Sequence, residues 1–265
     1  MNQVFVTGGS GFVGQNLIPM LIKNGYNVKA LARSSQAIQK VEQLGATAVK
    51  GDLNDKQVLK DGVKNCSSVF HLAASVDFFA SEKKLKKLHV DATELLLEVA
   101  KNAKVQRFLY LSAASVIMNG KPIKNADETF VSDNIIDGYS RTKLQAEYLV
   151  LKANTKNFQT IAVRPPLVWG KGDPNTLVGI MKATKKGRMQ FIDGGNHRLV
   201  TCHVLNVCHA LILADQSEQN GKTYFITDGE TPVFKDFIKK YVATQGVTIS
   251  EKSVSLAMAK RVASE

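Results

Sequence analysis

The chain has 265 residues, of which 44% are hydrophobic, so it is long enough and apolar enough to bury a substantial core and is not expected to be disordered. Its 35 Lys and Arg residues exceed its 23 Asp and Glu residues and give a net charge of +12, which favours anionic partners. The basic residues are dispersed. The densest group, at 83–87, alternates with leucines at helical spacing, so we do not expect nucleic acid as a partner.

The N-terminal sequence and the cysteines indicate where in the cell the chain is expected and whether it binds a metal. A strand is predicted to begin at residue 2 or 3, which leaves no room for a signal peptide, and no apolar run reaches the roughly 18 residues that span a bilayer. Three scattered cysteines argue against a disulfide framework, so we expect a cytoplasmic protein without an integral membrane segment. Cys202 and His209 could share a helix face, but the spacing of a four-ligand zinc site is missing, and no metal is expected.

Short β-rich runs alternate with helical patterns along the chain, which predicts a parallel sheet built from βα units. We expect strands near 2–7, 27–32, 46–50, 67–72, 107–112 and 158–164. Helices are expected near 12–24, 35–44, 55–62, 82–103, 134–154 and 175–187. This order is typical of an α/β doubly wound parallel sheet, the Rossmann fold, with ligands at the carboxyl ends of the strands. Beyond it, a short strand pair is expected around 189–192 and 198–202, then a strand at 223–227 and helices at 234–243 and 250–265.

The first predicted strand runs directly into a glycine-rich turn and a helix, the context of a dinucleotide-binding site. Gly8 allows a tight turn, Gly11 lets backbone amides approach a pyrophosphate, and Gly14 lets the helix lie close to its strand. The helix N-terminus adds unpaired donors and the positive end of its dipole. The residues expected to hold the pyrophosphate are Gly8, Gly9, Ser10, Gly11, Phe12, Val13 and Gly14. The alternative is a glycine-rich turn without a ligand.

Residues after the next three strands are candidates for binding the rest of the dinucleotide. Arg33 and Ser34 stand where an acidic residue would bind the ribose of NAD and an Arg would accommodate the 2′-phosphate of NADP, so NADP is favoured over NAD. An exposed Arg before a helix is the alternative. Asp52 and Leu53 could contact the adenine, although Asp52 could instead cap the next helix. The fourth strand ends in small residues that leave room for the cofactor, at Leu72, Ala73 and Ala74.

Tyr139 and Lys143 lie four residues apart on the helix predicted at 134–154 and therefore share one face. A nearby ammonium favours the phenolate and is expected to lower the pKa of Tyr139 from about 10 toward neutrality. Such a tyrosine suits proton exchange with an alcohol or ketone oxygen. The position of the pair, after the fifth strand of a dinucleotide fold, makes it a candidate catalytic pair.

Together, the segment Thr7–Gly14, Gly51-Asp52-Leu53, the small-residue end of the fourth strand, and Tyr139 with Lys143 resemble an extended short-chain dehydrogenase/reductase, the epimerase/dehydratase-like group. Later segments are similar to the branch of 3-beta-hydroxysteroid and sterol-4-carboxylate dehydrogenases. They are Leu111–Ile117, Asn119-Gly120, Arg164-Pro165-Pro166, His203-Val204 with Asn206-Val207, and Tyr224–Gly229. The resemblance covers roughly residues 1 to 235.

The resemblance implies a catalytic Tyr139, a Lys143 that also binds the nicotinamide ribose, and a serine that hydrogen-bonds the reacting oxygen. Ala113 stands where the family's more important hydroxyl is usual. Ser115 shares its face in an extended strand and could replace it, whereas Ser112 could do so only if the chain turns, and neither serine need be catalytic. The segment with Pro166 and Val168 is implied to pass the nicotinamide amide.

A further departure from the family pattern is His89, where relatives usually carry Asn. It could take over a structural role near the active site or be an ordinary helix residue. His71, which ends the fourth strand among apolar neighbours, is expected to be a packed, hydrogen-bonded histidine.

We expect a dinucleotide-binding domain at 1–170 and a small substrate-binding lobe at 171–265, interleaved with the end of the sheet. Family members generally run several tens of residues further, so the sequence is either a short natural form or a fragment. The leading hypothesis is an NADP(H)-dependent oxidoreductase acting on a secondary alcohol or ketone, steroid-like by resemblance. A nucleotide-sugar epimerase or dehydratase and a non-catalytic NADP-binding sensor are the alternatives. The expected partners are a small-molecule substrate and, as one option, a second copy in a homodimer.

Overall fold

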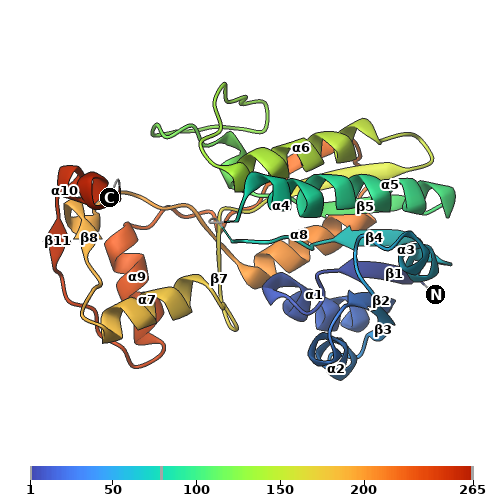
Figure 1. The fold of residues 1–265 in the computed structure, drawn as a ribbon, viewed down its shortest axis with the longest axis horizontal. Helices are drawn as coiled ribbons and strands as arrows, with labels where there is room; N and C mark the ends of the chain where they lie inside the picture. Colours follow the sequence, from blue (N-terminus) through green and yellow to red (C-terminus); the bar gives the residue numbers. More distant parts are fainter. Residues whose placement is uncertain (1, 78–79, 264–265) are drawn as a thin grey trace. The chain divides into compact units, whose positions relative to one another are not determined.

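The computed structural model describes residues 2–77 and 80–263, and its largest feature is a seven-stranded sheet in which every strand pair is parallel (Figure 1). The strands lie in the order β10-β6-β5-β4-β1-β2-β3. They are β1 (Asn2–Thr7), β2 (Tyr26–Ala32), β3 (Thr47–Lys50), β4 (Ser68–His71), β5 (Arg107–Leu111), β6 (Gln159–Arg164) and β10 (Lys222–Phe225). The α/β doubly wound fold is therefore confirmed, with β10 as a seventh strand at the edge.

The registers of the central strands bring their carboxyl ends to one edge of the sheet. Thr7 of β1 is opposite His71 of β4, which is opposite Tyr110 of β5. The chain order reverses between β1 and β4, and ligands in such sheets bind outside the strand ends at this switch point. The middles of the central strands are largely apolar because helices cover both faces of the sheet.

Two layers of helices flank this sheet. One layer packs α3 (Lys56–Val63), α5 (Ala92–Asn102) and α6 (Gly138–Lys152) side by side, and the other packs α1 (Phe12–Lys23) against α8 (Val204–Gln216) (Figure 1). The right-handed β1-α1-β2-α2-β3 connections put α2 (Ser35–Gln43) in the layer of α1. The main core lies between the first layer and the sheet, where Phe5, Leu96 and Phe108 are fully buried.

Two helices near the expected site differ from the sequence prediction. The helix expected over 82–103 is divided into α4 (Glu82–Lys86), a π-helical turn at Lys87–Asp91, and α5. Helix α6 begins at Gly138 and not near 134, because the Asp137 carboxylate caps it by accepting a hydrogen bond of 2.8 Å from the Ser140 amide. Tyr139 therefore lies in the first turn of α6.

The chain forms two compact units. The first runs to Pro166 and takes up the chain again over Val204–Ile226, so α8 and β10 belong to it; the second comprises Leu167–His203 and the chain from Thr227 onward. In the second unit β7 (Leu167–Trp169) pairs with β9 (Thr201–His203), and β8 (Phe191–Ile192) pairs with β11 (Ser253–Val254). Its helices are α7 (Thr176–Lys185), α9 (Phe234–Ala243) and α10 (Leu256–Ala263).

The strand pair expected between 189–192 and 198–202 is wrong, since β8 and β9 each pair with another strand. The turn at Asp193–Gly195 is held by two hydrogen bonds to residues much later in the chain. The Gly194 amide donates to the Ser253 hydroxyl at 2.7 Å, and the Asp193 carboxylate accepts from the Leu256 amide at 3.0 Å. These contacts draw β11 to β8. Over residues 250–263 the expected single helix is likewise replaced by β11 and α10, and residues 264 and 265 of that prediction lie outside the described residues.

Across the part of the chain that the structure describes, no helix combines the length and the apolar character that crossing a bilayer requires.

Candidate active site

The segments that follow β1, β2, β3, β4 and β5 all leave the same edge of the parallel sheet, and they carry most of the residues that the sequence singled out. Pro166 is the last residue of the first stretch of this unit. Its neighbour Pro165 accepts a hydrogen bond of 2.8 Å from the Ala114 amide, which ties this segment to the chain after β5. Val168 instead belongs to the second unit, where it pairs with Cys202 of β9.

The glycine turn after β1 has the shape that a pyrophosphate requires. Gly8 adopts a positive φ of 72°, and a Cβ atom there would lie 2.7 Å from the Ala73 amide nitrogen. A Cβ on Gly14 would lie 2.3 Å from the Gly8 carbonyl oxygen, whereas a Cβ on Gly11 would approach only that oxygen, at 3.2 Å. Among the residues that the structure describes, no side chain caps the first amides of α1. The turn is therefore tightly packed against Ala73 and its own backbone at Gly8 and Gly14, and it is open at the N-terminus of α1. This arrangement fits a dinucleotide phosphate.

The candidate residues at the ends of β2 and β3 form an exposed ion pair. Arg33 Nη1 lies 3.3 Å from Asp52 Oδ2, and the Arg33 side chain is 82% exposed. The amide and side chain of Asn54, and then Arg33, lower the pKa of the Asp52 carboxyl. Ser34 caps α2 by accepting from the Ala37 amide at 3.2 Å. A guanidinium at this position is open to a further anion.

The alternative in which Asp52 caps the next helix is wrong. Helix α3 is capped by Asp55, whose carboxylate accepts from the amides of Gln57 and Val58 at 2.9 and 3.1 Å. Leu53 is only 6% exposed and belongs to the main core. Its contact with an adenine ring stays a prediction.

The loop after β4 lies against the glycine turn. The Leu72 amide donates to the Thr7 carbonyl at 3.2 Å, and Leu72 is buried, whereas Ala73 is half-buried and Ala74 is exposed. His71 is buried and hydrogen-bonded through both ring nitrogens, as expected of a packed histidine. The small side chains of this loop thus border the turn.

Tyr139 and Lys143 share one face of α6, but the electrostatics differ from the expectation. Lys143 is 1% exposed, and its Nζ donates to the Leu111 carbonyl at 2.6 Å and lies 4.2 Å above the Tyr110 ring. Burial lowers the pKa of Lys143 to about 7, with Glu147 acting in the opposite direction. Burial, and then Asp137, raise the pKa of Tyr139 to about 12.

The expected lowering of the Tyr139 pKa is therefore wrong for the chain by itself. Desolvation of a half-buried phenol disfavours the phenolate. The Lys143 ammonium, for its part, is bonded to the Leu111 carbonyl.

The two candidate serines occupy different environments. Ser115 lies in a short 3-10 helix, Ala114–Ile117, and its hydroxyl is 2.8 Å from the hydroxyl of Ser140, the residue after Tyr139. Ser112 is 3% exposed, and its hydroxyl finds no hydrogen-bond partner among the described residues. The turn of the chain after β5 thus brings Ser115, and not Ser112, to the residue beside Tyr139.

A buried ion pair beneath the site was not foreseen from the sequence. Arg164, the last residue of β6, donates to Glu147 from Nη2 at 2.5 Å and from Nε at 3.0 Å, and both side chains are buried. Glu147 lies one turn beyond Lys143 on α6. The signal in the sequence is the spacing of four between Tyr139, Lys143 and Glu147, which marks one helix face.

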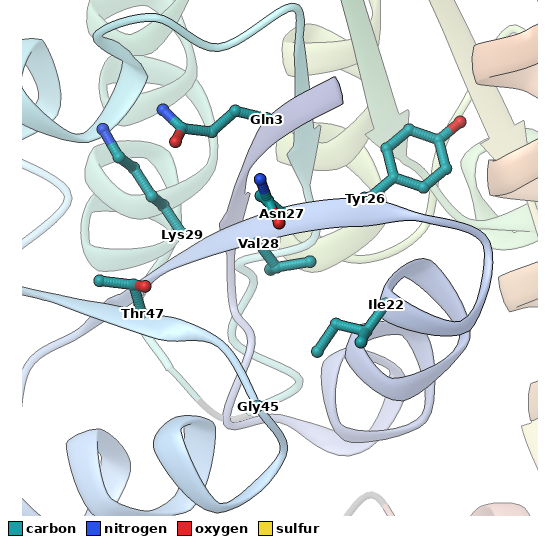
Figure 2. A pocket seen from close by; sticks show the side chains of 8 residues that line it. All are labelled: Gln3, Ile22, Tyr26, Asn27, Val28, Lys29, Gly45 and Thr47. Carbon is teal, nitrogen blue, oxygen red and sulfur yellow. The ribbon is translucent and has the colours of Figure 1, made fainter. Parts of the chain in front are cut away.

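Two other regions do not contribute to this site. Cys202 lies in β9 and His209 in α8, so they share no helix face, and within the described ranges no three His, Cys, Asp or Glu side chains gather into a metal site. Figure 2 shows a pocket around the beginnings of β1, β2 and β3, at the opposite edge of the sheet from the glycine turn. It is lined by Gln3, Ile22, Tyr26, Asn27, Val28, Lys29, Gly45 and Thr47.

The chain is similar to known oxidoreductases over most of its length. The chain is 37% identical over 262 residues to a 4-hydroxy-2-methyl-3-oxo-4-farnesyl-3,4-dihydroquinoline-1-oxide ketoreductase of Stigmatella aurantiaca, covering 98% of this chain and 78% of the relative. It is 35% identical to a decarboxylating sterol-4-alpha-carboxylate 3-dehydrogenase of Dictyostelium discoideum, covering 95% and 79%.

Solved structures are similar over almost the whole chain. The crystal structure of gox2253 superposes with a TM-score of 0.84 at 25% identity, covering 99% of this chain and 80% of that one. MoeE5 in complex with UDP-glucuronic acid and NAD superposes with a TM-score of 0.80 at 26% identity, covering 96% and 85%. The resemblance stated from the sequence is confirmed.

Residues 5–258 match the 3-beta hydroxysteroid dehydrogenase/isomerase family. Since this match spans nearly the whole chain and the relatives are oxidoreductases, the chain is an NAD(P)-dependent short-chain dehydrogenase/reductase that belongs to the 3-beta hydroxysteroid dehydrogenase/isomerase family.

Proposed function

We propose that the chain is an NADP(H)-dependent oxidoreductase that interconverts a ketone and a secondary alcohol on an apolar, steroid-like substrate, with Tyr139 as the acid/base. The observation that carries this proposal is the placement of Tyr139 and Lys143 on one face of α6, a helix that lies beside β5 and β6 and begins near their carboxyl ends. The glycine turn leaves the same edge of the sheet from β1. The names of two relatives contain a farnesyl and a sterol group, which supports an apolar substrate.

Within this site the cofactor would be held by the glycine turn, by Arg33 at its 2′-phosphate, and by Lys143 at the nicotinamide ribose. When bound, the nicotinamide supplies or accepts the hydride. Tyr139 Oη gives its proton to the ketone oxygen during reduction, and a pKa near 12 keeps the phenol protonated and ready to do so. The Ser115 hydroxyl accepts from Ser140 and keeps its own proton for the same substrate oxygen.

The segment between β5 and α6 supports an apolar substrate. Met118, Val131 and Ile136 are exposed there, and the Ile136 amide donates to the Met118 carbonyl at 3.4 Å. Exposed apolar side chains on the segment that leads into α6 favour a substrate that buries a hydrocarbon surface. NADP is favoured over NAD because Arg33 presents an exposed guanidinium where the 2′-phosphate is expected.

The test is ketone reduction by Tyr139→Phe. The variant keeps the ring but has no proton to give, so reduction of apolar ketones should fall by about 10²-fold or more while NADPH affinity stays nearly unchanged. Tyr148→Phe is the matched control, because Tyr148 is an exposed tyrosine on the same helix. Turnover retained by Tyr139→Phe would exclude the assigned role.

A second candidate is a nucleotide-sugar epimerase or dehydratase, supported by the likeness to MoeE5 with UDP-glucuronic acid and NAD. An activity assay of the purified protein separates the two functions. The protein is given NADPH with a panel of apolar ketones and, in parallel, a panel of UDP-sugars. Conversion of a sugar nucleotide without net NADPH oxidation would favour this second function.

A further inference from the structure

His89 joins three parts of the site through one side chain. It lies in the π-helical turn Lys87–Asp91 and is 1% exposed. Its Nε2 is 3.0 Å from the Ser75 amide in the loop after β4, and its Nδ1 is 2.9 Å from the Thr142 hydroxyl on α6. Its ring meets the Tyr139 ring edge to face, with centroids 5.5 Å apart and an angle of 87°. Short π turns are rare in proteins, and those that do occur often lie at functional sites.

The direction of these hydrogen bonds fixes the protonation of His89. A backbone amide can only donate, so Nε2 must accept from Ser75 and carries no proton. The proton of the neutral ring is then on Nδ1 and is donated to Thr142, whose own proton goes to the Gly138 carbonyl at 2.8 Å. A charged imidazolium would set its N–H against the N–H of Ser75. The arrangement therefore requires a neutral His89.

A second chain of hydrogen bonds holds the backbone of the same turn. The Thr93 hydroxyl donates to the His89 carbonyl, which leaves Thr93 to accept from His71 Nε2 at 2.8 Å. His71 Nδ1 then accepts from the Thr7 hydroxyl at 2.6 Å, and Thr7 accepts from the Ala73 amide at 3.3 Å. The π turn is thereby tied to the last residue of β1, directly before the glycine turn.

The charges around both imidazoles favour their neutral forms. Lys143 on α6 faces both histidines, and His71 on β4 faces His89. Burial and Lys143 lower the pKa of His89 to about 4 and that of His71 to about 3.

We propose that His89 is a positioning residue for the reaction: its neutral imidazole, held between the Ser75 amide and the Thr142 hydroxyl, fixes the Tyr139 ring relative to the loop that borders the cofactor. This inference rests on the proposed function. Tyr139 lies in the first turn of α6, so a contact that anchors Thr142 and meets the Tyr139 ring sets where the phenol hydroxyl points. Misplacement of a reacting group by about 1 Å lowers turnover by about 10²-fold.

The kinetic test compares three variants in the full chain. His89→Leu removes both hydrogen bonds of the imidazole. Thr142→Val leaves the bond to Ser75 and removes the bond between His89 and α6, together with the Thr142 bond to the Gly138 carbonyl. His89→Gln offers an acceptor and a donor on a side chain of similar length. We expect His89→Leu and Thr142→Val to lower kcat by about 10-fold to 100-fold, with NADPH affinity changed less than about 3-fold. His89→Gln should keep kcat within about 3-fold of the wild type.

A coupling test and a control accompany these variants. His89→Leu with Thr142→Val should be little worse than either change alone, because both break the same contact. Val90→Ala, a truncation of a buried apolar neighbour on the same π turn, should lower stability without a specific loss of kcat. If His89→Leu does not fold, Thr142→Val decides the question.

Nuclear magnetic resonance gives a readout that does not depend on turnover. With ¹⁵N-labelled histidine, Nδ1 of His89 should carry the proton and Nε2 should not, from about pH 5.5 to about pH 8. With ¹³C-labelled tyrosine, the Tyr139 ring resonance should shift in His89→Leu and Thr142→Val and return in His89→Gln.

The outcomes separate the inference from the function. An unchanged Tyr139 resonance, an unchanged kcat in both Leu and Val variants, or a parallel loss of stability, NADPH affinity and kcat that Gln does not restore, each overturns the positioning role. If the wild type reduces no ketone while the resonances behave as expected, the proposed function fails and the placement of Tyr139 by His89 stands.

Discussion

The hydroxyl groups of Ser115 and Ser140 lie 2.8 Å apart and join the short helix after β5 to the first turn of α6. Ser140 is fully buried and follows Tyr139 directly in the chain. The contact thus brings the Ser115 hydroxyl to the residue that follows Tyr139, in a chain that carries Ala113 at the family's usual serine position.

Removal of the Ser115 hydroxyl should slow the reaction. Ser115→Ala takes away the proposed donor to the substrate oxygen, and loss of one such donor lowers kcat by about 10²-fold. Ser140→Ala should have a smaller effect in the same direction, because Ser115 then keeps its hydroxyl but loses the partner that orients it. Steady-state ketone reduction measures both.

Ser112→Ala is the matched control. The Ser112 hydroxyl is buried without a hydrogen-bond partner among the described residues, so its removal should leave kcat unchanged and leave stability equal or slightly higher. A larger loss of kcat in Ser112→Ala than in Ser115→Ala would reverse the assignment of the two serines.

Cofactor preference should depend on Arg33. Replacement by Asp reverses the charge where the 2′-phosphate is expected, so Arg33→Asp should weaken NADPH binding by about 10-fold or more, at least about 1.4 kcal/mol, and leave NADH binding nearly unchanged. Fluorescence titration with each cofactor measures the two affinities.

Lys60→Asp makes the same change of charge on an exposed residue of α3 and controls for the general electrostatic effect. Asp52→Asn should have the opposite effect on NADPH affinity. It removes the ion-pair partner of Arg33 and leaves the guanidinium to the 2′-phosphate, so NADPH binding should become stronger. Equal losses of NADPH and NADH affinity in Arg33→Asp would refute the assignment.

The buried ammonium of Lys143 should make stability depend on pH. Its pKa is about 7 in the folded chain and 10.5 for the ordinary group, so between these values the unfolded chain holds a proton that the folded chain has released. Stability from this group therefore rises as the pH increases through this window, and the burial penalty is complete at pH 7 and below. Lys143→Met should raise the free energy of unfolding most at low pH, by at most about 5 kcal/mol, while abolishing ketone reduction.

Urea unfolding at about pH 6, about pH 8 and about pH 10 measures this effect. Lys60→Met, which removes an exposed ammonium, should show no comparable dependence on pH. A Lys143→Met variant that is equally destabilised at all three pH values would show that the Leu111 hydrogen bond and the contact with Tyr110 outweigh the burial of the charge.

Several features of the fold and the site could be predicted from the sequence because their causes are local. The passage from an apolar strand to Gly8 and Gly14 predicts a tight turn and a close helix, and both glycines have no room for a side chain. The alternation of strand and helix patterns placed six strands of the sheet to within about two residues, within the usual error of element boundaries. The spacing of Tyr139 and Lys143 fixed their common helix face.

Contacts between distant parts of the chain could not be predicted in this way. The π turn around His89 and the pairing of β8 with β11 both depend on partners that the local pattern does not reveal. The direction of the Tyr139 pKa is a further case, because burial by the fold outweighed the helical spacing from which a lowering was expected.

By itself, the sequence determined the class of fold, the tight glycine turn after β1 and the common helix face of Tyr139 and Lys143, since backbone geometry and side-chain period act over a few residues. Only the tertiary structure decided that Ser115 is the hydroxyl brought to the residue beside Tyr139, that Lys143 is bonded to Leu111, and that His89 bridges Ser75 and Thr142. These relationships arise because burial and long-range hydrogen bonds fix side chains whose positions in the sequence are 14 to 53 residues apart.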